Sequence, residues 1–157
     1  MQDTMTIRPR MTHVATLVPE AVRAIYALTK SAKQGGLPET TAMMVHLRAS
    51  QINGCSLCAE MHSRELEEAG EPSQKIWTVA AWREAPYFTE AERAALELTE
   101  AVTRISDRPD PVSDEVWEQA ARHYDEQGLA SLLIEIATIN VWNRLNVATR
   151  TPAGSWG

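Results

Sequence analysis

Residues 129–147 form the segment that most constrains the fold of this chain. Drawn as a helix, the segment has apolar side chains on nearly every side, and such a helix is buried on most of its surface. The apolar positions are Leu132, Leu133, Ile134, Ile136, Ile139, Val141, Trp142 and Leu145. Glu135, three asparagines and Arg144 interrupt the segment, which indicates a core helix and not a membrane span. We expect it at the centre of a helical bundle or at a subunit interface.

Proline, glycine and capping residues divide the remaining sequence into helix-length segments, and no segment has the alternation of a strand. Thr89 and Glu92 match a capping box, Ser113 is a helix cap, and Gly128 separates the last two helices. The predicted helices span residues 19–33, 38–51, 55–70, 73–82, 89–105 and 113–127, followed by the apolar helix. The pattern predicts an all-α fold.

The length and the charge of the chain limit its possible functions. At 157 residues we expect one domain, residues 1–157, with a core large enough to fold without disulfide staples. The net charge of −6 and the absence of a basic run argue against a nucleic-acid partner. Residues 1–10 lack the apolar region of a secretory signal, so we expect a soluble, cytoplasmic protein without a membrane partner. In a reducing compartment, a close cysteine pair is more often catalytic or metal-binding than structural.

Both cysteines of the chain lie in one short motif, Cys55-x-x-Cys58, with His62 four residues later. On a helix these spacings of three and four residues place all three side chains on one face. A dithiol beside an imidazole can cycle between disulfide and thiolate, with a base at hand to move the proton. The motif therefore predicts redox chemistry.

The residues alone leave the nucleophile open. The turn at Asn53-Gly54 places Cys55 at a helix N-terminus, where backbone N–H groups and the helix dipole stabilise a thiolate. Cys58 instead faces His62, which can accept its proton. Other readings of the motif are two buried apolar cysteines beside a core histidine, or a zinc site that lacks a fourth ligand. A thioredoxin-like site would need a βαβ setting, which this sequence does not offer.

The cysteine motif and its surroundings resemble the carboxymuconolactone decarboxylase-like, alkyl hydroperoxidase D-like family. The similarity lies within residues 40–150, at 47–58, 61–62, 81–84, 88–96, 100–103 and 139–145. The resemblance implies an all-helical bundle that forms homo-oligomers, commonly trimers or hexamers. In the peroxide-reducing members the second cysteine attacks the hydroperoxide and the first resolves the sulfenic acid to a disulfide. By resemblance these roles fall on Cys58 and Cys55, and His62 belongs to the proton relay.

Two relay positions of that family are occupied differently in this chain. The family's histidine between the cysteines is Leu57 here, and its glutamate twelve residues before the first cysteine is Met43. His46 lies one helical turn after Met43, where it could substitute in the relay or be a partly exposed helix residue. Glu135 in the apolar helix is either a base near the site or a paired carboxylate, for example with an arginine.

Three groups of residues outside the motif also carry expectations. Trp77 and Trp82 could line an apolar approach to the thiols, while Trp142 is expected in the core. Asn140, Asn143 and Arg144 could satisfy one another or a neighbouring subunit. The acidic cluster at residues 65–68 is expected to be a solvated face, and the tail at residues 151–157 to pack as an extended arm or fray.

Together the motif and the resemblance predict a thiol-dependent peroxidase or disulfide reductase acting on organic hydroperoxides. The resemblance implies no metal or organic cofactor, so electrons would come from an external dithiol protein or a small thiol. One alternative is a lyase of the carboxymuconolactone decarboxylase type, although those members generally work without the cysteine pair. Another alternative is a non-catalytic helical scaffold with a vestigial dithiol.

Overall fold

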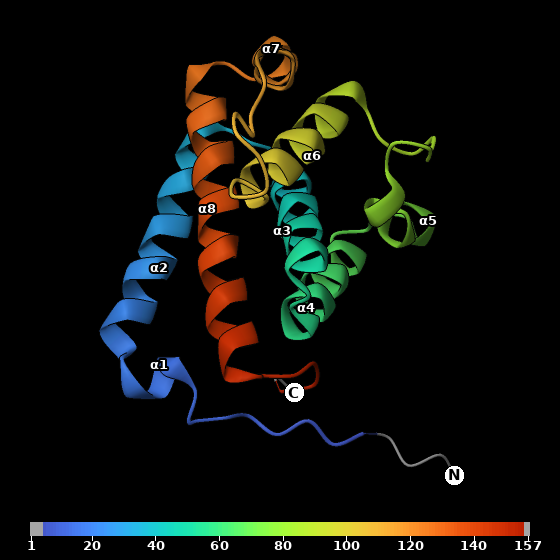
Figure 1. Ribbon diagram of the computed structural model, residues 1–157. Coiled ribbons are helices and arrows are strands. Elements are labelled where there is room, and N and C mark those ends of the chain that lie inside the picture. Colours follow the sequence, from blue (N-terminus) through green and yellow to red (C-terminus); the bar gives the residue numbers. More distant parts are fainter. Residues whose placement is uncertain (1–4, 156–157) are drawn as a thin grey trace.

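The computed structural model describes residues 5–155, and within this range the regular secondary structure is all helical, with no strand (Figure 1). The predicted all-α fold is therefore confirmed. The helices are α1 (Val14–Leu17), α2 (Pro19–Ala32), η1 (Lys33–Gly35), α3 (Glu39–Asn53), α4 (Ser56–Glu68), α5 (Ser73–Trp77), η2 (Val79–Ala81), α6 (Glu90–Thr103), α7 (Asp114–His123) and α8 (Glu126–Thr149). No helix in the described range is long and apolar enough to cross a membrane.

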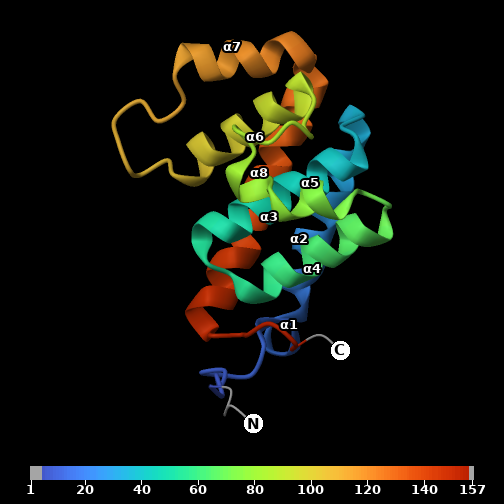
Figure 2. The same ribbon diagram turned by 90° about the vertical axis from the view of Figure 1, so that its right-hand side faces the viewer.

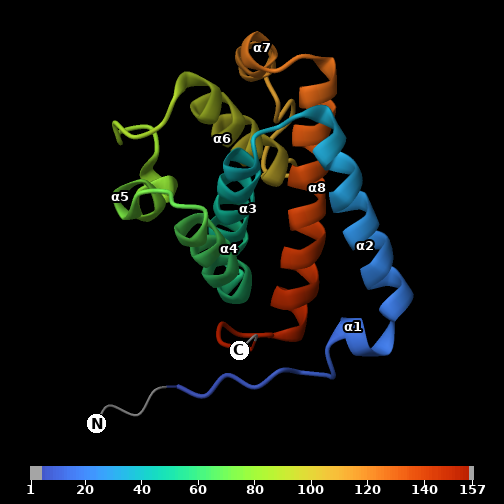
Figure 3. The same ribbon diagram turned by 180° about the vertical axis from the view of Figure 1, so that it is seen from behind.

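The apolar helix α8 runs through the middle of the bundle, with α2 on one side and α3 and α6 on the other (Figures 1 and 3). Leu132, Ile136 and Ile139 are almost completely buried, so they form the centre of the core. Burial of such side chains contributes roughly 1.5–3 kcal/mol each to folding. Of the two positions expected for this helix, the central one is confirmed by its packing.

Helices α3 and α4 form an antiparallel hairpin whose tight connection presents the cysteine motif (Figure 2). Gly54 ends α3 in the left-handed conformation, with φ of 68°, which a residue with a side chain adopts only at a cost. Cys55 follows as the N-cap of α4, and its sulfur accepts the backbone N–H of Cys58. The glycine turn thus delivers both cysteines to the start of α4.

The structure corrects two helix boundaries. The predicted helix at residues 73–82 is broken at Thr78 into α5 and η2. The sixth helix ends at His123 and not at residue 127, because Asp125 caps α8 by accepting the N–H of Gly128 at 2.8 Å. Gly128 is therefore inside the first turn of α8 and does not separate the helices.

Helix α2 contacts α8 through a narrow face. Val22 is buried, but Tyr26 and Leu28 are exposed. After α2, η1 approaches α8 so closely that a Cβ on Gly35 would collide with the side chain of Ser131 and the backbone carbonyl of Gln127. Glycine at position 35 therefore permits the contact between the end of α2 and the start of α8.

Candidate functional site

A cavity of about 270 Å³ lies between α2, α3, α4 and α8, and Cys58 is in its wall. We call it the Cys58 cavity. It brings together the titratable residues proposed from the sequence, His46, His62 and Glu135, with Glu65 beside them. Its other lining residues are Tyr26, Thr29, Lys33, Glu39, Ala42, Met43, Met61, Thr138, Ile139, Trp142 and Asn146.

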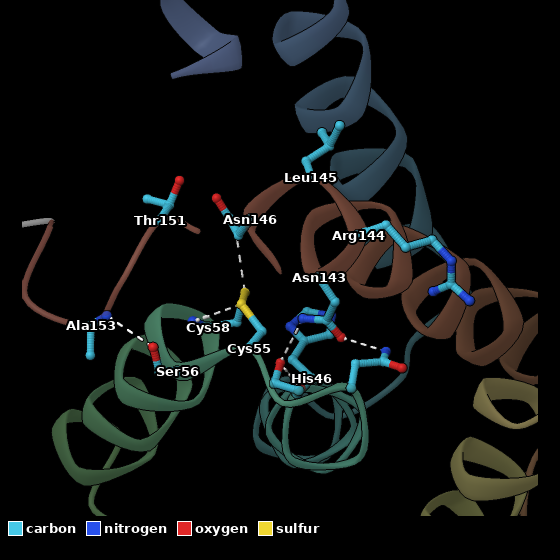
Figure 4. Close-up of a disulfide and its surroundings, with 12 residues drawn as sticks. His46, Cys55, Ser56, Cys58, Asn143, Arg144, Leu145, Asn146, Thr151 and Ala153 are labelled. Carbon is cyan, nitrogen blue, oxygen red and sulfur yellow. Dashed lines mark hydrogen bonds between the residues drawn. A yellow bond between two sulfur atoms is a disulfide. The ribbon is translucent and has the colours of Figure 1, made fainter. Parts of the chain in front are cut away.

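The two cysteines form a disulfide at the start of α4, and both are buried. The backbone N–H of Cys58 lies 3.3 Å from Sγ of Cys55, and Nδ2 of Asn146 lies 3.6 Å from Sγ of Cys58. Figure 4 shows Asn146 pointing from α8 toward the sulfur bridge. Each sulfur therefore has one N–H donor that would also stabilise it as a thiolate.

The predicted position of Cys55 within the first helical turn is wrong by one residue. With φ of −83° and ψ of 96°, Cys55 is the extended N-cap residue, and α4 begins at Ser56. An N-cap side chain accepts the free N–H groups of the first turn, which is the interaction made by the Cys55 sulfur. The N-terminus of α4, which can stabilise a Cys55 thiolate, and the imidazole of His62, which can accept the proton of Cys58, are therefore both present at the site.

His62 forms a pair with Glu65, one helical turn later. Nδ1 of His62 lies 2.7 Å from Oε2 of Glu65. Burial lowers the pKa of His62 most; the hydrogen bond to Glu65 opposes this and nearby His46 adds to it, so the pKa lies below the usual 6.5. The hydrogen bond from His62 in turn lowers the pKa of Glu65. At neutral pH His62 is thus an uncharged imidazole that can accept a proton. Glu67 and Glu68 are exposed, as expected of the acidic cluster, while Glu65 is 42% exposed and also lines the Cys58 cavity.

His46 forms a second pair, with Glu135 across the cavity. Nε2 of His46 lies 2.7 Å from Oε2 of Glu135, and the side chains are only 14% and 4% exposed. The partner of Glu135 is a histidine and not the arginine offered as an example, and His46 is largely buried. The rings of His46 and His62 lie 4.8 Å apart between centroids, so the two histidine–carboxylate pairs are adjacent.

The remainder of the cavity wall is largely apolar. The rings of Tyr26 and Trp142 lie 5.6 Å apart between centroids and form one side of it. Met43 occupies another part of the wall, so a family relay position faces the cavity with a thioether in place of a carboxylate. Leu57, the other divergent position, is buried with the cysteines and Ile139 in a hydrophobic cluster.

The structure places the two predicted wall tryptophans elsewhere. Trp77 is 74% exposed at the end of α5, and Trp82 is buried against Glu100, to which its Nε1 donates at 2.9 Å. Neither lines the Cys58 cavity. Trp142 packs against the buried cluster of the cysteines and also lines the cavity, where its ring lies beside that of Tyr26.

The asparagines of α8 are paired mainly with the α3–α4 connection. Asn53 donates Nδ2 to both Asn140 and Asn143, at 3.0 and 2.9 Å, and Asn143 donates to Ser50 at 3.0 Å. Arg144 bonds to Asn140, as one of the expected alternatives had it. These bonds fix the turn that carries the cysteines against α8. The tail, as far as residue 155, packs on α4 through Ser56 and Glu60.

Within residues 5–155, no three histidine, cysteine or acidic side chains are placed to hold a metal ion. The zinc interpretation of the motif would need such a group. The site that the chain does present is a dithiol with two adjacent histidine–carboxylate pairs. Its groups can ionise a thiol, stabilise a thiolate and transfer a proton.

The sequence matches the carboxymuconolactone decarboxylase family over residues 19–101. The chain belongs to this family. It is 35% identical over 139 residues to the uncharacterized protein YdfG of Bacillus subtilis (strain 168), covering 88% of this chain and 93% of that protein. The family indicated by the cysteine motif is thereby confirmed.

Two solved structures are similar to this family member. One is ATU0492 of Agrobacterium tumefaciens, described as a protein of unknown function and a candidate antioxidant defence protein AhpD. It has 34% identity and a TM-score of 0.86, over 93% of this chain and 98% of that one. The other is the debrominase Bmp8 in complex with 2,3,4-tribromopyrrole, with 21% identity and a TM-score of 0.75, over 86% of this chain and 71% of that one. The second similarity shows a shared fold.

Sequence reasoning missed two residues of the site. Glu65 stands three positions after His62, a spacing that indicates contact on a helix, so this pair could have been found. Asn146 had no such signal, because it reaches Cys58 from another helix. Its amide oxygen lies 3.3 Å from Nε2 of His13, which orients the N–H groups toward the sulfur.

Proposed function

We propose that this member of the carboxymuconolactone decarboxylase family is a thiol-dependent peroxidase that reduces organic hydroperoxides. The observation that carries the proposal is that Cys58, joined to Cys55, lies in the wall of a cavity that also contains two histidine–carboxylate pairs. The Cys58 thiolate attacks the terminal peroxide oxygen, the O–O bond breaks, and Cys58 becomes a sulfenic acid. Cys55 then attacks the Cys58 sulfur, releases water and forms the disulfide.

The histidine–carboxylate pairs supply the protons of this reaction. His62 is neutral at pH 7 and can accept the Cys58 proton, after which Glu65 stabilises the imidazolium. The departing alkoxide needs a proton, and His62 or its neighbour His46 can donate one. Glu135 holds His46 in place through their 2.7 Å contact. In this arrangement Glu135 supplies the carboxylate that the family has at the position occupied by Met43 in this chain.

The direct test oxidises the reduced protein with one equivalent of cumene hydroperoxide and measures its intact mass. Formation of the Cys55–Cys58 disulfide lowers the mass of the reduced protein by about two units, and Cys58→Ser abolishes turnover with a dithiol reductant. Cys55→Ser should instead accumulate the sulfenic acid, trapped with dimedone. Full turnover by Cys58→Ser would overturn the proposed mechanism, and absence of hydroperoxide turnover in the wild type would favour a lyase or a scaffold.

The proposal extends to the partners and the surroundings of the enzyme. Each turnover consumes two electrons, which an external dithiol protein or a small thiol must restore. A reducing, cytoplasmic compartment supplies such thiols. From the resemblance to the family we also propose a homo-oligomer, a trimer or a hexamer, which sedimentation analysis would test.

Reductive debromination is a second candidate, because Tyr26 and Trp142 give the Cys58 cavity an aromatic wall and the debrominase Bmp8 shares the fold. In such a reaction the dithiol becomes a disulfide while an aryl bromide is converted to the arene, bromide and a proton. Bromide release from 2,3,4-tribromopyrrole, measured with excess thiol, would support this activity. Peroxide turnover without bromide release would leave peroxide reduction as the only supported activity.

A further inference from the structure

A second cavity, of about 470 Å³, lies on the other side of the disulfide, and Cys55 is in its wall. We call it the Cys55 cavity. It is formed by residues 5–8, by the α3–α4 connection and by the end of α8 with the following tail. Asn146 lines both cavities, so the disulfide and this one asparagine separate them. In Figure 4, Thr151 of the tail lies on one side of the sulfur bridge and His46 on the other.

The Cys55 cavity is basic in a protein that is acidic overall. Arg8 and Arg150 line it, and none of the described residues of its wall is an aspartate or a glutamate. Neither guanidinium has an ion-pair partner within the described part of the chain, whereas the chain as a whole carries a net charge of −6. Two unpaired arginines above a disulfide favour an anionic ligand. The Cys58 cavity, in contrast, is lined by three glutamates, two of which are bonded to its two histidines.

The two cavities give access to different sulfur atoms. A thiolate that cleaves a disulfide attacks one sulfur from the side opposite the other sulfur, so that the departing thiolate leaves along the same line. A reductant in the Cys55 cavity is therefore placed to attack Cys55, and one in the Cys58 cavity to attack Cys58. Exchange is faster when the departing thiolate is better stabilised.

The hydrogen bonds of the site suit attack on Cys55. Cys58 would depart beside the N–H group of Asn146, and His62 lies one helical turn away to supply a proton. The backbone N–H of Cys58 contacts the Cys55 sulfur, which stabilises Cys55 when it departs in the second exchange. Each sulfur thus has a donor for the step in which it leaves.

We propose that the Cys55 cavity binds a small thiol bearing carboxylate groups, which regenerates the enzyme by attacking Cys55. The inference rests on the dithiol cycle of the proposed function and names the class of its reductant. The reductant thiolate bonds to Sγ of Cys55, the S–S bond breaks, and Cys58 leaves as a thiolate. A second molecule of the thiol attacks the reductant sulfur of this mixed disulfide and releases Cys55. Two thiols are thereby oxidised to one disulfide, and the enzyme gains two electrons and two protons.

The first experiment measures the reduction of the oxidised protein by thiols of different charge. The probes are mercaptosuccinate, 2-mercaptoethanol and cysteamine, used at low ionic strength with protein oxidised by diamide. Arg8→Ala and Arg150→Gly should each lower the rate with mercaptosuccinate about two- to fivefold and leave that with 2-mercaptoethanol unchanged. Glycine at position 150 preserves the left-handed φ of 55° while it removes the charge. Arg122→Ala, on α7 at the far end of the bundle, is the matched control.

The second experiment identifies the sulfur attacked. Oxidised protein mixed briefly with mercaptosuccinate is quenched with iodoacetamide, and fragment masses locate the two labels. We expect the mercaptosuccinyl group on Cys55 and the carbamidomethyl group on Cys58. The reverse labelling would overturn the inference. So would reduction rates that depend on the charge of the thiol equally in the wild type and in both arginine variants, or reduction by protein dithiols but not by small thiols. Because no peroxide is used, these outcomes do not depend on whether the protein is a peroxidase.

Discussion

Glu135 of α8 and His46 of α3, 89 positions apart in the sequence, are joined by a 2.7 Å hydrogen bond inside the Cys58 cavity. The family relay takes its carboxylate from the position that is Met43 here. In this chain a carboxylate enters the same cavity from a different helix and contacts a histidine one turn after Met43. A buried pair of this kind is costly unless both partners are present, which gives it a clear experimental signature.

Replacing Glu135 with glutamine is expected to slow peroxide reduction at least about tenfold, because His46 loses the carboxylate that orients it. Stopped-flow measurement of Cys58 oxidation by cumene hydroperoxide would show this. Glu39→Gln is the matched control, because Glu39 lines the same cavity at its exposed edge, where it pairs with Lys33. Equal rates in the two variants would contradict a role for Glu135.

A rescue experiment tests whether position 43 and position 135 are alternative sources of the carboxylate. M43E alone is expected to bring no gain, because a second carboxylate near Glu135 disfavours ionisation of both. In the Glu135→Gln background the same substitution should restore much of the lost rate. M43Q in that background is the control for the change in polarity. If M43E reduces peroxide no faster than M43Q in the Glu135→Gln background, positions 43 and 135 are not alternative sources of the carboxylate.

The acid limb of the pH profile should depend on Glu65. Its hydrogen bond raises the pKa of His62 against the larger lowering by burial, so Glu65→Gln should lower that pKa further and move the acid limb of peroxide reduction to lower pH. Glu68→Gln, an exposed change on the same helix, should leave the profile unchanged. An acid limb that moves to higher pH would show that another group controls it.

The lowered pKa of His62 also determines how the stability of the fold changes with pH. The folded-state pKa of His62 lies below its unfolded value near 6.5, so the unfolded chain binds the additional proton and stability falls as the pH drops through this region. Replacing His62 with glutamine should reduce the loss of Tm between pH 7.5 and 5.5. A steeper loss in the variant would mean that the surroundings stabilise the protonated imidazolium of His62, and so raise its pKa instead of lowering it.

The sequence predicted those features that depend on local spacing. The all-round apolar pattern of residues 129–147 indicated a helix buried on most sides, either central in the bundle or at a subunit interface. The motif of Cys55, Cys58 and His62 indicated a dithiol site because three- and four-residue spacing fixes proximity on one helix. Gly54 likewise marked the turn before the motif, since it adopts a left-handed conformation there.

The sequence could not predict contacts between helices. Asn146 and Glu135 reach the site from α8, and only the packing of α8 against α3 and α4 shows which of its polar residues face the cavity. Gly128 looked like a boundary because glycine often ends helices, but the carboxylate of Asp125 moved the start of α8 two residues before it. Trp82 was misplaced because its indole N–H has a buried partner, Glu100, that composition does not reveal.

Asn146 should control the reactivity of the Cys58 thiolate. Replacing it with leucine preserves its size but removes the N–H group 3.6 Å from the sulfur, so alkylation of Cys58 in the reduced protein at pH 7 should slow about three- to tenfold. Gln127→Leu, at an exposed position near the start of the same helix, is the control. An unchanged rate for Asn146→Leu would mean that the bond contributes only to the disulfide form.

Glu100 is expected to be the largest single electrostatic contribution to stability outside the site. It is buried and accepts hydrogen bonds from Arg48, Trp82 and Arg83 at 2.8, 2.9 and 2.6 Å. Replacing it with glutamine leaves Arg48 buried without its counter-charge, which should cost about 3–5 kcal/mol in the free energy of unfolding. Urea melts would measure this cost. Glu97→Gln, which loses only a 3.6 Å contact with Arg83, should change it by less than about 1 kcal/mol.

The pH dependence of this contribution provides an independent check. Burial works to raise the pKa of Glu100, but hydrogen bonds from Arg83, Trp82 and Arg48 outweigh it and hold the pKa below its usual 4.5. The carboxylate therefore stabilises the fold fully above that pH, and the contribution disappears as the pH falls through the lowered folded-state value. The difference in unfolding free energy between wild type and Glu100→Gln should accordingly be constant from pH 8 to about 5.5 and shrink in more acidic solution. A difference that grows below pH 5 would contradict the assigned direction of the pKa.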